Sequence, residues 1–431
     1  MESMTSQPQQ PQRSANTRRA PGSNEIVLPI GLQQYQQACS EPALFHRLLE
    51  QQHQAHPECF PVEFEDGYQL KDIIFSSKLE IHIRRITVSF GDRAHNYRIL
   101  PCDVLPHMCG MTAEVADPLF LRKFNVPYWA LARIFERDAN YYYRVERRMG
   151  KTSLVGALHG RDGQLPEDVC CDEKHAKHLG EKAYVTTTSG GGCVLGAHLC
   201  EGADAQSLAE GYGVFRDEMA RTNPDSRVRS INVDGFAATS AALRLVFGPA
   251  VILITCFLHL YISIRDGAKK KHAEIFTEIA DYLWWIYEAG TKRSFAQRWS
   301  SLMRWRRHND HRLPERIASK LDRANDNKLD GYKAFYDTGQ RGHRLSCALD
   351  RQMGSLDRKL FAMRYLHGHW ESSNLLIRAW AHLHNFAPWN PRSANLHQAQ
   401  CPQERLTGFR YRDDWLQNFR VASSLQGYRY P

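Results

Sequence analysis

The segment 245–264 is a long apolar run that follows shortly after the acidic residue Asp234. A membrane-spanning helix needs about 20 predominantly apolar residues, but Gly248 and Pro249 interrupt this run near its start. The uninterrupted part, 251–258, has the length of a β-strand and is rich in β-branched residues. This pattern predicts a buried strand of a parallel sheet that is covered on both faces. We therefore expect no membrane span and no membrane partner.

The net charge of the chain is its most informative bulk property. At 431 residues the sequence is long enough for two or three domains, and 42% hydrophobic residues is ordinary for a globular protein. The formal charge of +9 is less ordinary, because a basic surface attracts polyanions and steers their approach. Nucleic acid is therefore the expected class of partner, and the alternative is a basic protein without such a partner.

The cysteines and the first residues indicate where the protein works. The eleven cysteines are scattered and odd in number, and none shows the CxxC spacing of a structural zinc site or redox motif. This indicates a reducing environment, so we expect a cytoplasmic protein. Residues 1–25 lack the apolar core of a signal peptide and predict a disordered, mildly basic leader.

From Leu165 onward the order of the predicted elements is β-β-β-α-β-α-β-α. Asp204 is the expected N-cap of the first helix. Three strands in hairpin succession are followed by two right-handed parallel crossovers, and this is the order of the ribonuclease H-like α/β fold, with a mixed sheet. The predicted strands are 168–172, 182–188, 193–200, 226–234 and 250–257.

The remaining segments suggest further divisions of the chain. Region 26–160 is expected to be an N-terminal α+β and helical DNA-binding region, with a candidate helix-turn-helix at 117–153. A plain helical connector is the alternative there. The predicted divisions that follow are a first part of the core, a basic helical insertion, the final core helices and a C-terminal tail, at 165–266, 267–342, 343–395 and 396–431.

Two acids end neighbouring strands of this predicted sheet. Asp172 and Asp234 end the first and fourth strands. This fold places these two strands side by side, about 4.8 Å apart. The carboxyl ends of such strands are where open α/β sheets bind ligands. Two carboxylates at so short a distance repel each other unless a cation lies between them. A pair of Mg²⁺ ions in such a site can drive in-line displacement at a phosphodiester. Alternatively, each acid is an ordinary turn or capping residue.

A third acid is needed to complete such a site. The helix after the insertion offers Asp350 and Asp357, which are seven residues apart and lie on one face. We prefer Asp350, which is closer to the helix start, and Glu371 is a further candidate. His259 and His175 are candidates to assist the site or to contact a phosphate. For all of these residues the alternative is an ordinary surface or structural role.

Basic residues form two candidate DNA-binding groups. The first group lies late in the candidate helix-turn-helix and comprises Arg144, Arg147, Arg148 and Lys151. The second lies in the insertion, where ten Lys or Arg residues occur in 291–323, and includes Arg304, Arg306 and Arg307. Aromatic residues, namely Phe295, Trp299 and Trp305, are interleaved with this second group. We favour DNA contact, and an amphipathic helix whose aromatic face lies in a core is the alternative.

The sequence resembles the DDE-type transposases of bacterial insertion sequences from about residue 60 onward. The resemblance lies in "DEKH" after the first strand, in "NVDGF" with "CFLHLYISIRD", and in "LDRQMGSLDRKLFAMRYLHGHWESSNLLIRAWAHLHNFAPWNP". The closing "CPQERLTGFRYRDDWLQNFRVAS" is also similar to the tail of such proteins.

This resemblance implies a ribonuclease H-like core interrupted by a helical insertion. It further implies metal-dependent cleavage and joining of double-stranded DNA, at element ends and target, with two Mg²⁺ or Mn²⁺ ions. The implied catalytic and metal-binding residues are Asp172, Asp234 and, as the loosest match, Asp350. A homo-oligomer on DNA and a location with the nucleoid are implied as well. The alternatives are a nuclease or resolvase of the same fold and an inactive DNA-binding derivative.

Overall fold

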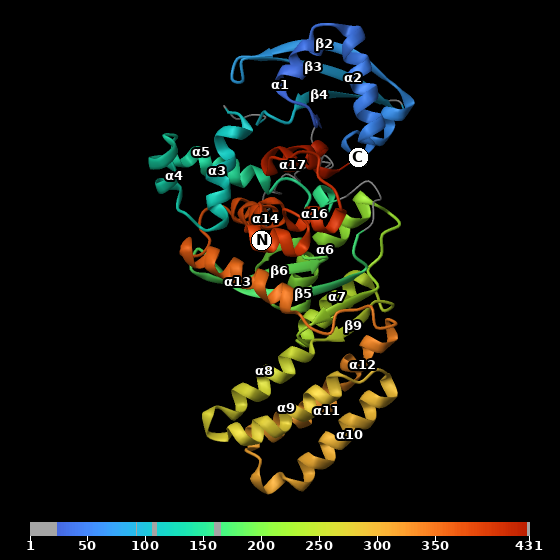
Figure 1. Cartoon of the computed structure of the whole chain (residues 1–431), viewed down its shortest axis with the longest axis vertical. Coiled ribbons are helices and arrows are strands. Elements are labelled where there is room, and N and C mark those ends of the chain that lie inside the picture. Colours follow the sequence, from blue (N-terminus) through green and yellow to red (C-terminus); the bar gives the residue numbers. More distant parts are fainter. Residues whose placement is uncertain (1–23, 92, 106–109, 159–164, 429–431) are drawn as a thin grey trace, which may run out of the picture.

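The computed structural model describes residues 24–91, 93–105, 110–158 and 165–428. Figure 1 shows an elongated molecule in which a small N-terminal sheet lies at one end and a body of helices at the other. A five-stranded sheet lies between them. The predicted leader falls almost wholly outside the described residues.

The N-terminal unit is a four-stranded sheet with two helices on one face. The strand order is β1-β4-β3-β2, with β1 parallel to β4 and the other neighbours antiparallel. Tyr35, Phe45 and Leu49 of the helices pack into one buried cluster with the sheet. The elements are β1 (Glu25–Leu28), α1 (Leu32–Cys39), α2 (Pro42–Ala55), β2 (Tyr68–Ser76), β3 (Ile81–Phe90) and β4 (Arg93–Pro101).

Three short helices occupy the segment for which a helix-turn-helix is predicted. They are α3 (Thr112–Lys123), α4 (Tyr128–Phe135) and α5 (Ala139–Met149). The buried Glu146 carboxylate holds them together, since it accepts hydrogen bonds from Arg122 Nε at 2.6 Å, from the Tyr128 hydroxyl at 2.8 Å and from Lys359 Nζ. Because α5 also packs against α14 (Trp370–Phe386), much of its surface is already covered.

The central sheet has the strand order β7-β6-β5-β8-β9. Its first three strands are antiparallel neighbours, and β8 and β9 continue the sheet in parallel with β5. The mixed α/β architecture and the predicted order of elements are therefore confirmed, as is the Asp204 cap, which accepts hydrogen bonds from two backbone N–H groups. The elements are β5 (Asp168–His178), β6 (Glu181–Gly190), β7 (Cys193–Cys200), α6 (Ala205–Thr222), β8 (Ser230–Val233), α7 (Ala237–Phe247) and β9 (Ile252–Thr255).

Strand β5 is longer than the sequence pattern predicts. It continues past Asp172 and pairs with β6 as far as His178 opposite Glu181. Asp172 therefore lies inside the strand, at the point where the pairing with the shorter β8 runs out. The prediction that the strand ends at this acid is wrong, because the polar residues after it still have a backbone partner in β6.

Helices cover both faces of the central sheet. Val169 and Cys171 belong to a buried cluster with side chains of α6 and α7, whereas Cys170 belongs to a cluster with side chains of α13 and α14. Successive strand residues point to opposite faces, so Asp172 shares its face with Cys170. The remaining helices here are α13 (Cys347–Ala362), α15 (Pro391–His397), α16 (Pro402–Thr407) and α17 (Trp415–Ala422).

The helical body forms a separate hydrophobic core between β9 and α13. Its helices are α8 (Phe257–Ala268), α9 (Ala273–Tyr287), α10 (Lys292–His308), α11 (Glu315–Asn327) and α12 (Leu329–Asp337). The buried cluster begins at Phe257, so the body starts before the predicted boundary at 267. Its two ends meet, because the Phe257 backbone N–H donates to the Arg344 carbonyl at 3.0 Å.

The aromatic residues of α10 form part of this core. Phe295 is fully buried, Trp299 is 2% exposed, and Trp305 packs against the same cluster. The prediction that they are DNA-contacting anchors is therefore wrong. The alternative of an amphipathic helix with an inward aromatic face is what the structure shows.

None of the helices in the described residues combines the length and the apolar character needed to cross a membrane. Gly248 ends α7, and the apolar residues on either side of it belong to two helices and one short strand. This agrees with the expectation that the apolar run is not a membrane span.

Candidate active site

The pairing of β5 with β8 brings Asp172 and Asp234 together. The last paired residues are Cys170 and Asn232, and every pair in this register is 62 positions apart. Asp172 and Asp234 are also 62 positions apart (234 minus 172) and follow two residues later on each chain. The two acids therefore occupy equivalent positions on adjacent parallel segments, as the sequence predicts.

Asp172 carries a strongly perturbed carboxyl group. Burial and the negative charges of Glu173 and Asp234 raise the pKa of Asp172 to about 7, although the Glu173 backbone N–H donates to its Oδ1 at 2.8 Å. A carboxylate in this position is short of positive charge at neutral pH. Such a group favours either a proton or a bound cation.

Glu173 points to the opposite face of the sheet. Its carboxylate accepts hydrogen bonds from the Thr239 hydroxyl of α7 at 2.7 Å and the Tyr212 hydroxyl of α6 at 3.3 Å. Burial and the Asp234 charge raise the pKa of Glu173 despite these bonds. Glu173 therefore adds negative charge near Asp172 and is itself held by structural partners.

A tight turn fixes the position of Asp234. Its Oδ1 accepts a hydrogen bond from the Phe236 backbone N–H at 2.7 Å, and Lys328 Nζ donates to its backbone carbonyl at 3.2 Å. Gly235 has φ +87°, and a Cβ at this position would lie 2.7 Å from Lys328 Nζ. A side chain here would therefore strain the backbone and displace the lysine.

Asp350 is a third acid close to the residues around Asp172 and Asp234. It lies in the first turn of α13, and the Ser346 hydroxyl lies 3.1 and 3.2 Å from its two carboxylate oxygens. Asp350 and Asp172 are both among the negative charges that raise the pKa of His259. This places Asp350 on the side of the sheet that Asp172 faces.

The two other candidates for the third acid have different settings. Asp357 forms an ion pair with Lys174, whose Nζ lies 2.9 Å from Asp357 Oδ2, and its side chain is 56% exposed. Glu371 is exposed in the first turn of α14. Of the three acids, Asp350 is the one that interacts electrostatically with His259, on which the charge of Asp172 also acts.

A cysteine and a histidine lie beside the acids. Hydrogen bonding to the Cys256 thiol and the charges of Asp350 and Asp172 raise the pKa of His259 to about 9, against the effect of its burial. Burial opposes ionisation of Cys256, but hydrogen bonding with His259 and Ser346 holds its pKa below the ordinary value. The Cys256 sulfur lies 3.3 Å from the Ser346 hydroxyl.

The sequence predicts His259 near the site but gives no weight to Cys256. The spacing of three residues at the end of a buried strand is the signal that could have found the cysteine. His175, the other histidine candidate, is exposed on β5 with its ring centroid 4.8 Å from that of Tyr184.

Several basic side chains line a cavity beside His259. A cavity of about 150 Å³ opens between α8 and α11, and its basic lining residues are His259, Lys320, Arg323 and Lys328. Burial and the nearby charges of Arg316 and Arg323 lower the pKa of Lys320. Because Lys328 also donates to the Asp234 backbone carbonyl, this basic cavity adjoins the turn that carries Asp234.

The basic residues predicted to bind DNA are only partly available. On α10, Arg306 is paired with Asp310 and Asp322, each at 2.8 Å, whereas Arg304 and Arg307 are exposed. The helices α5 and α10 lie far apart in Figure 1, so the two predicted groups form no single surface.

The basic residues of the α5 segment differ in the same way. Arg144 and Lys151 are exposed, but Arg147 donates to the Ser372 hydroxyl at 3.2 Å and Arg148 turns toward Glu25.

The sequence does not predict the basic cavity beside His259, because its residues come together only through the packing of α8 against α11.

The donor set partly matches a site for hard divalent cations. Asp172 and Asp234 supply two adjacent carboxylates, and the raised pKa of Asp172 indicates a place for positive charge. Among the residues that the structure describes, however, no group of three or more His, Cys, Asp or Glu side chains is arranged to hold a metal ion. Asp350 instead bonds to Ser346.

No protein-family model matches the sequence, and no curated protein matches it significantly.

Proposed function

We propose that the chain is a DNA transposase of the DDE type, with a ribonuclease H-like core that cleaves phosphodiesters and joins the freed 3′-hydroxyl to target DNA. The observation that carries this proposal is the placement of Asp172 and Asp234 at equivalent positions on β5 and β8. The strand order β7-β6-β5-β8-β9 and the helical body inserted after β9 support it.

Asp172 and Asp234 would hold the catalytic cations, and Asp350 would join them once its carboxylate leaves Ser346. Two bound Mg²⁺ or Mn²⁺ ions would supply positive charge to activate an attacking oxygen and to stabilise a leaving one. The turn at Gly235 keeps Asp234 in position, since it fixes both the side chain and the backbone carbonyl.

The basic cavity offers a place for a phosphate group of the scissile strand. His259, Lys320, Arg323 and Lys328 line it, and cationic side chains bind the phosphates of a DNA backbone with little regard to sequence. A strand whose phosphate is held there would pass close to Asp234, because Lys328 lines the cavity and contacts the Asp234 carbonyl. The basic cavity therefore supports a nucleic acid as the substrate class.

A DNA-binding derivative without catalysis is the second candidate, favoured by the bond between Ser346 and Asp350, which engages the third acid. A nuclease of the same fold, which cuts without joining, is the third.

Cleavage of DNA that carries the flanks of the encoding element tests these functions. We expect Mg²⁺-dependent nicking at the element ends, followed by joining to a target plasmid. Asp234→Asn should abolish both reactions, and Asp357→Asn, which alters only an exposed ion pair on α13, should retain them. Nicking without joining would indicate the nuclease, and DNA binding without nicking in any variant would indicate the derivative.

A further inference from the structure

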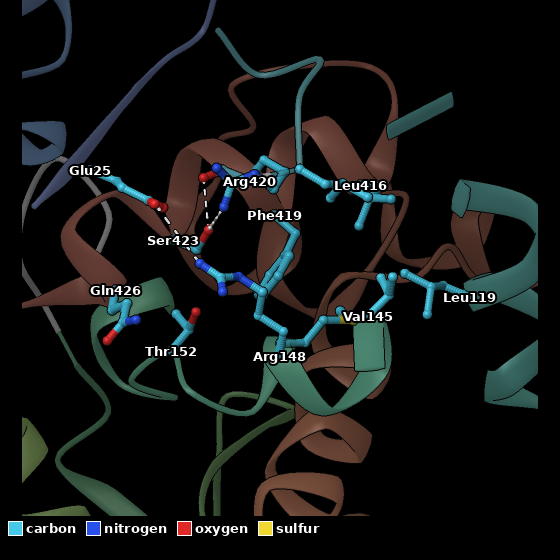
Figure 2. Close-up of a pocket in the computed structure, with 12 residues that line it drawn as sticks. Glu25, Leu119, Val145, Arg148, Thr152, Leu416, Phe419, Arg420, Ser423 and Gln426 are labelled. Atoms are coloured by element: carbon cyan, nitrogen blue, oxygen red, sulfur yellow. Dashed lines mark hydrogen bonds and ion pairs between the residues drawn. The ribbon is translucent and has the colours of Figure 1, made fainter. Parts of the chain in front are cut away.

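A second cavity lies where the N-terminal sheet, α5 and α17 meet. Its volume is about 50 Å³, and Figure 2 shows its lining residues. One side is apolar, with Leu119, Val145 and Phe419. The other side presents Arg148 and Arg420. A cavity with an apolar wall and a few convergent charged groups is the usual form of a small-molecule site.

Arg420 has a donor group without a partner. The residue is 9% exposed, its Nε donates to the Val104 carbonyl at 3.2 Å, and its Nη1 donates to the Ser423 hydroxyl at 3.3 Å. Its Nη2 is buried and has no hydrogen-bond partner within the described structure. A buried donor left unpaired is costly, and Arg420 is one of the residues that line the cavity, so an acceptor bound beside it would relieve this cost.

Arg148 brings a second positive charge to the same space. Figure 2 shows its guanidinium turned toward Ser423, as is that of Arg420. Its nearest carboxylate is Glu25, whose Oε1 lies 3.9 Å away, and Arg98 binds that same oxygen more closely at 2.5 Å. Arg148 therefore shares its nearest carboxylate with Arg98 and brings positive charge to the wall of the cavity.

We propose that this cavity binds a small organic anion. Its carboxylate or phosphate head would accept hydrogen bonds from Arg148 and from the free Nη2 of Arg420, because the guanidinium fork matches such heads. A short apolar body would lie against Leu119, Val145 and Phe419. The ligand must be small, since a cavity of about 50 Å³ admits only a few non-hydrogen atoms.

The site is separate from the carboxylate pair, and the proposal does not depend on the transposase function. Its lining comes from β1, α3, α5, α17 and the segments beside them, and none of the acids of the candidate active site belongs to it. A bound anion would join the N-terminal unit, through Glu25 and its arginines, to the C-terminal helix α17.

Thermal unfolding of the full chain, at constant ionic strength, tests the proposal with sodium acetate, methyl phosphate, inorganic phosphate and ethanol as probes. We expect acetate or methyl phosphate to raise the midpoint in a saturable way, with a Kd below about 10 mM. The better of the two identifies the head group, and ethanol should have no effect.

Variants locate the binding. Arg148→Gln should weaken it at least about tenfold, and Arg148→Lys, which keeps the charge but loses the fork, should weaken it less. Arg144→Gln, an exposed arginine on the same helix, should bind like the wild type. Equal shifts in the wild type and Arg148→Gln would overturn the proposal. So would equal shifts from inorganic phosphate and the organic anions, or no saturable shift at all.

Discussion

The carboxylate of Glu146 on α5 accepts a hydrogen bond from Lys359 on α13, 213 positions further along the chain. Both side chains are buried, and Arg122 completes the network from α3. Burial alone would raise the pKa of Glu146, but the charges and hydrogen bonds of Lys359 and Arg122 lower it to about 2. The three helices before the central sheet are thereby attached to a helix that covers it.

Loss of the Glu146 charge should destabilise the protein severely. Glu146→Gln leaves two cations buried without a counter-charge, and we expect the free energy of unfolding to fall by about 3 to 5 kcal/mol. Glu114→Gln is the control, because Glu114 pairs with Arg137 on the surface, where such pairs contribute about 0 to 1 kcal/mol. Urea unfolding measures both, and similar losses would contradict this account of the network.

Neutralising Asp172 should stabilise the protein at alkaline pH. Its pKa is raised to about 7, so the folded state holds a proton that the unfolded state has already released, and stability falls as pH rises from about 4 to 7. Asp172→Asn has no such cost, and we expect it to exceed the wild type by roughly 1 to 3 kcal/mol at pH 8 and by little at pH 4.

Asp168 is the matched control on the same strand. Hydrogen bonds from Arg229 and Ser230 lower its pKa against the effect of burial. Its ionised form therefore stabilises the fold, with stability lost as pH falls through the folded pKa. Asp168→Asn should accordingly destabilise at pH 8, and parallel pH profiles for the two variants would contradict both assignments.

Divalent cations should bind through the carboxylate pair. We expect Mn²⁺ to bind the wild type at pH 8, measured by loss of its free electron paramagnetic resonance signal, and to bind less tightly as the pH falls through about 7 because Asp172 takes up a proton. Asp234→Asn should abolish binding and Asp350→Asn should weaken it. Unchanged binding in Asp234→Asn would place the metal elsewhere.

The basic cavity should contribute to DNA affinity in a salt-dependent way. Lys320→Gln or Arg323→Gln should weaken binding of duplex DNA and reduce the slope of log K against log salt by about one. Arg306→Gln is the control, because Asp310 and Asp322 already pair with Arg306. Fluorescence anisotropy across a salt series measures the slopes, and equal slopes for all variants would remove the cavity from the DNA path.

Local signals predicted much of the central sheet. Strand β7 has its predicted bounds, and Asp204 caps α6 as expected, because hairpin turns and N-caps depend on residues close in sequence. The proximity of Asp172 and Asp234 followed from the order of strands. The extension of β5 to His178 could not be predicted from local signals, because exposed polar residues such as His175 and Lys177 are equally typical of a loop.

Contacts between segments that are distant in the sequence could not be predicted from such local signals. The pattern of α10 fits a DNA-binding face and a buried aromatic face equally well, and only the packing of Trp299 near Asn325, with a hydrogen bond of 2.9 Å, decides between them. The same holds for Ser346, which follows the helical body and bonds to Asp350 and Cys256. Neither contact leaves a periodic trace in the sequence.

The meeting of Phe257 and Arg344 at the two ends of the helical body has an evolutionary consequence. The intervening chain leaves the sheet and returns to it at neighbouring points, so a genetic event could exchange it as one cassette. A peptide of a few residues would bridge the gap, because the backbone atoms on either side already share a hydrogen bond. A change in the length of the helical body therefore need not move the end of β9 away from the start of α13.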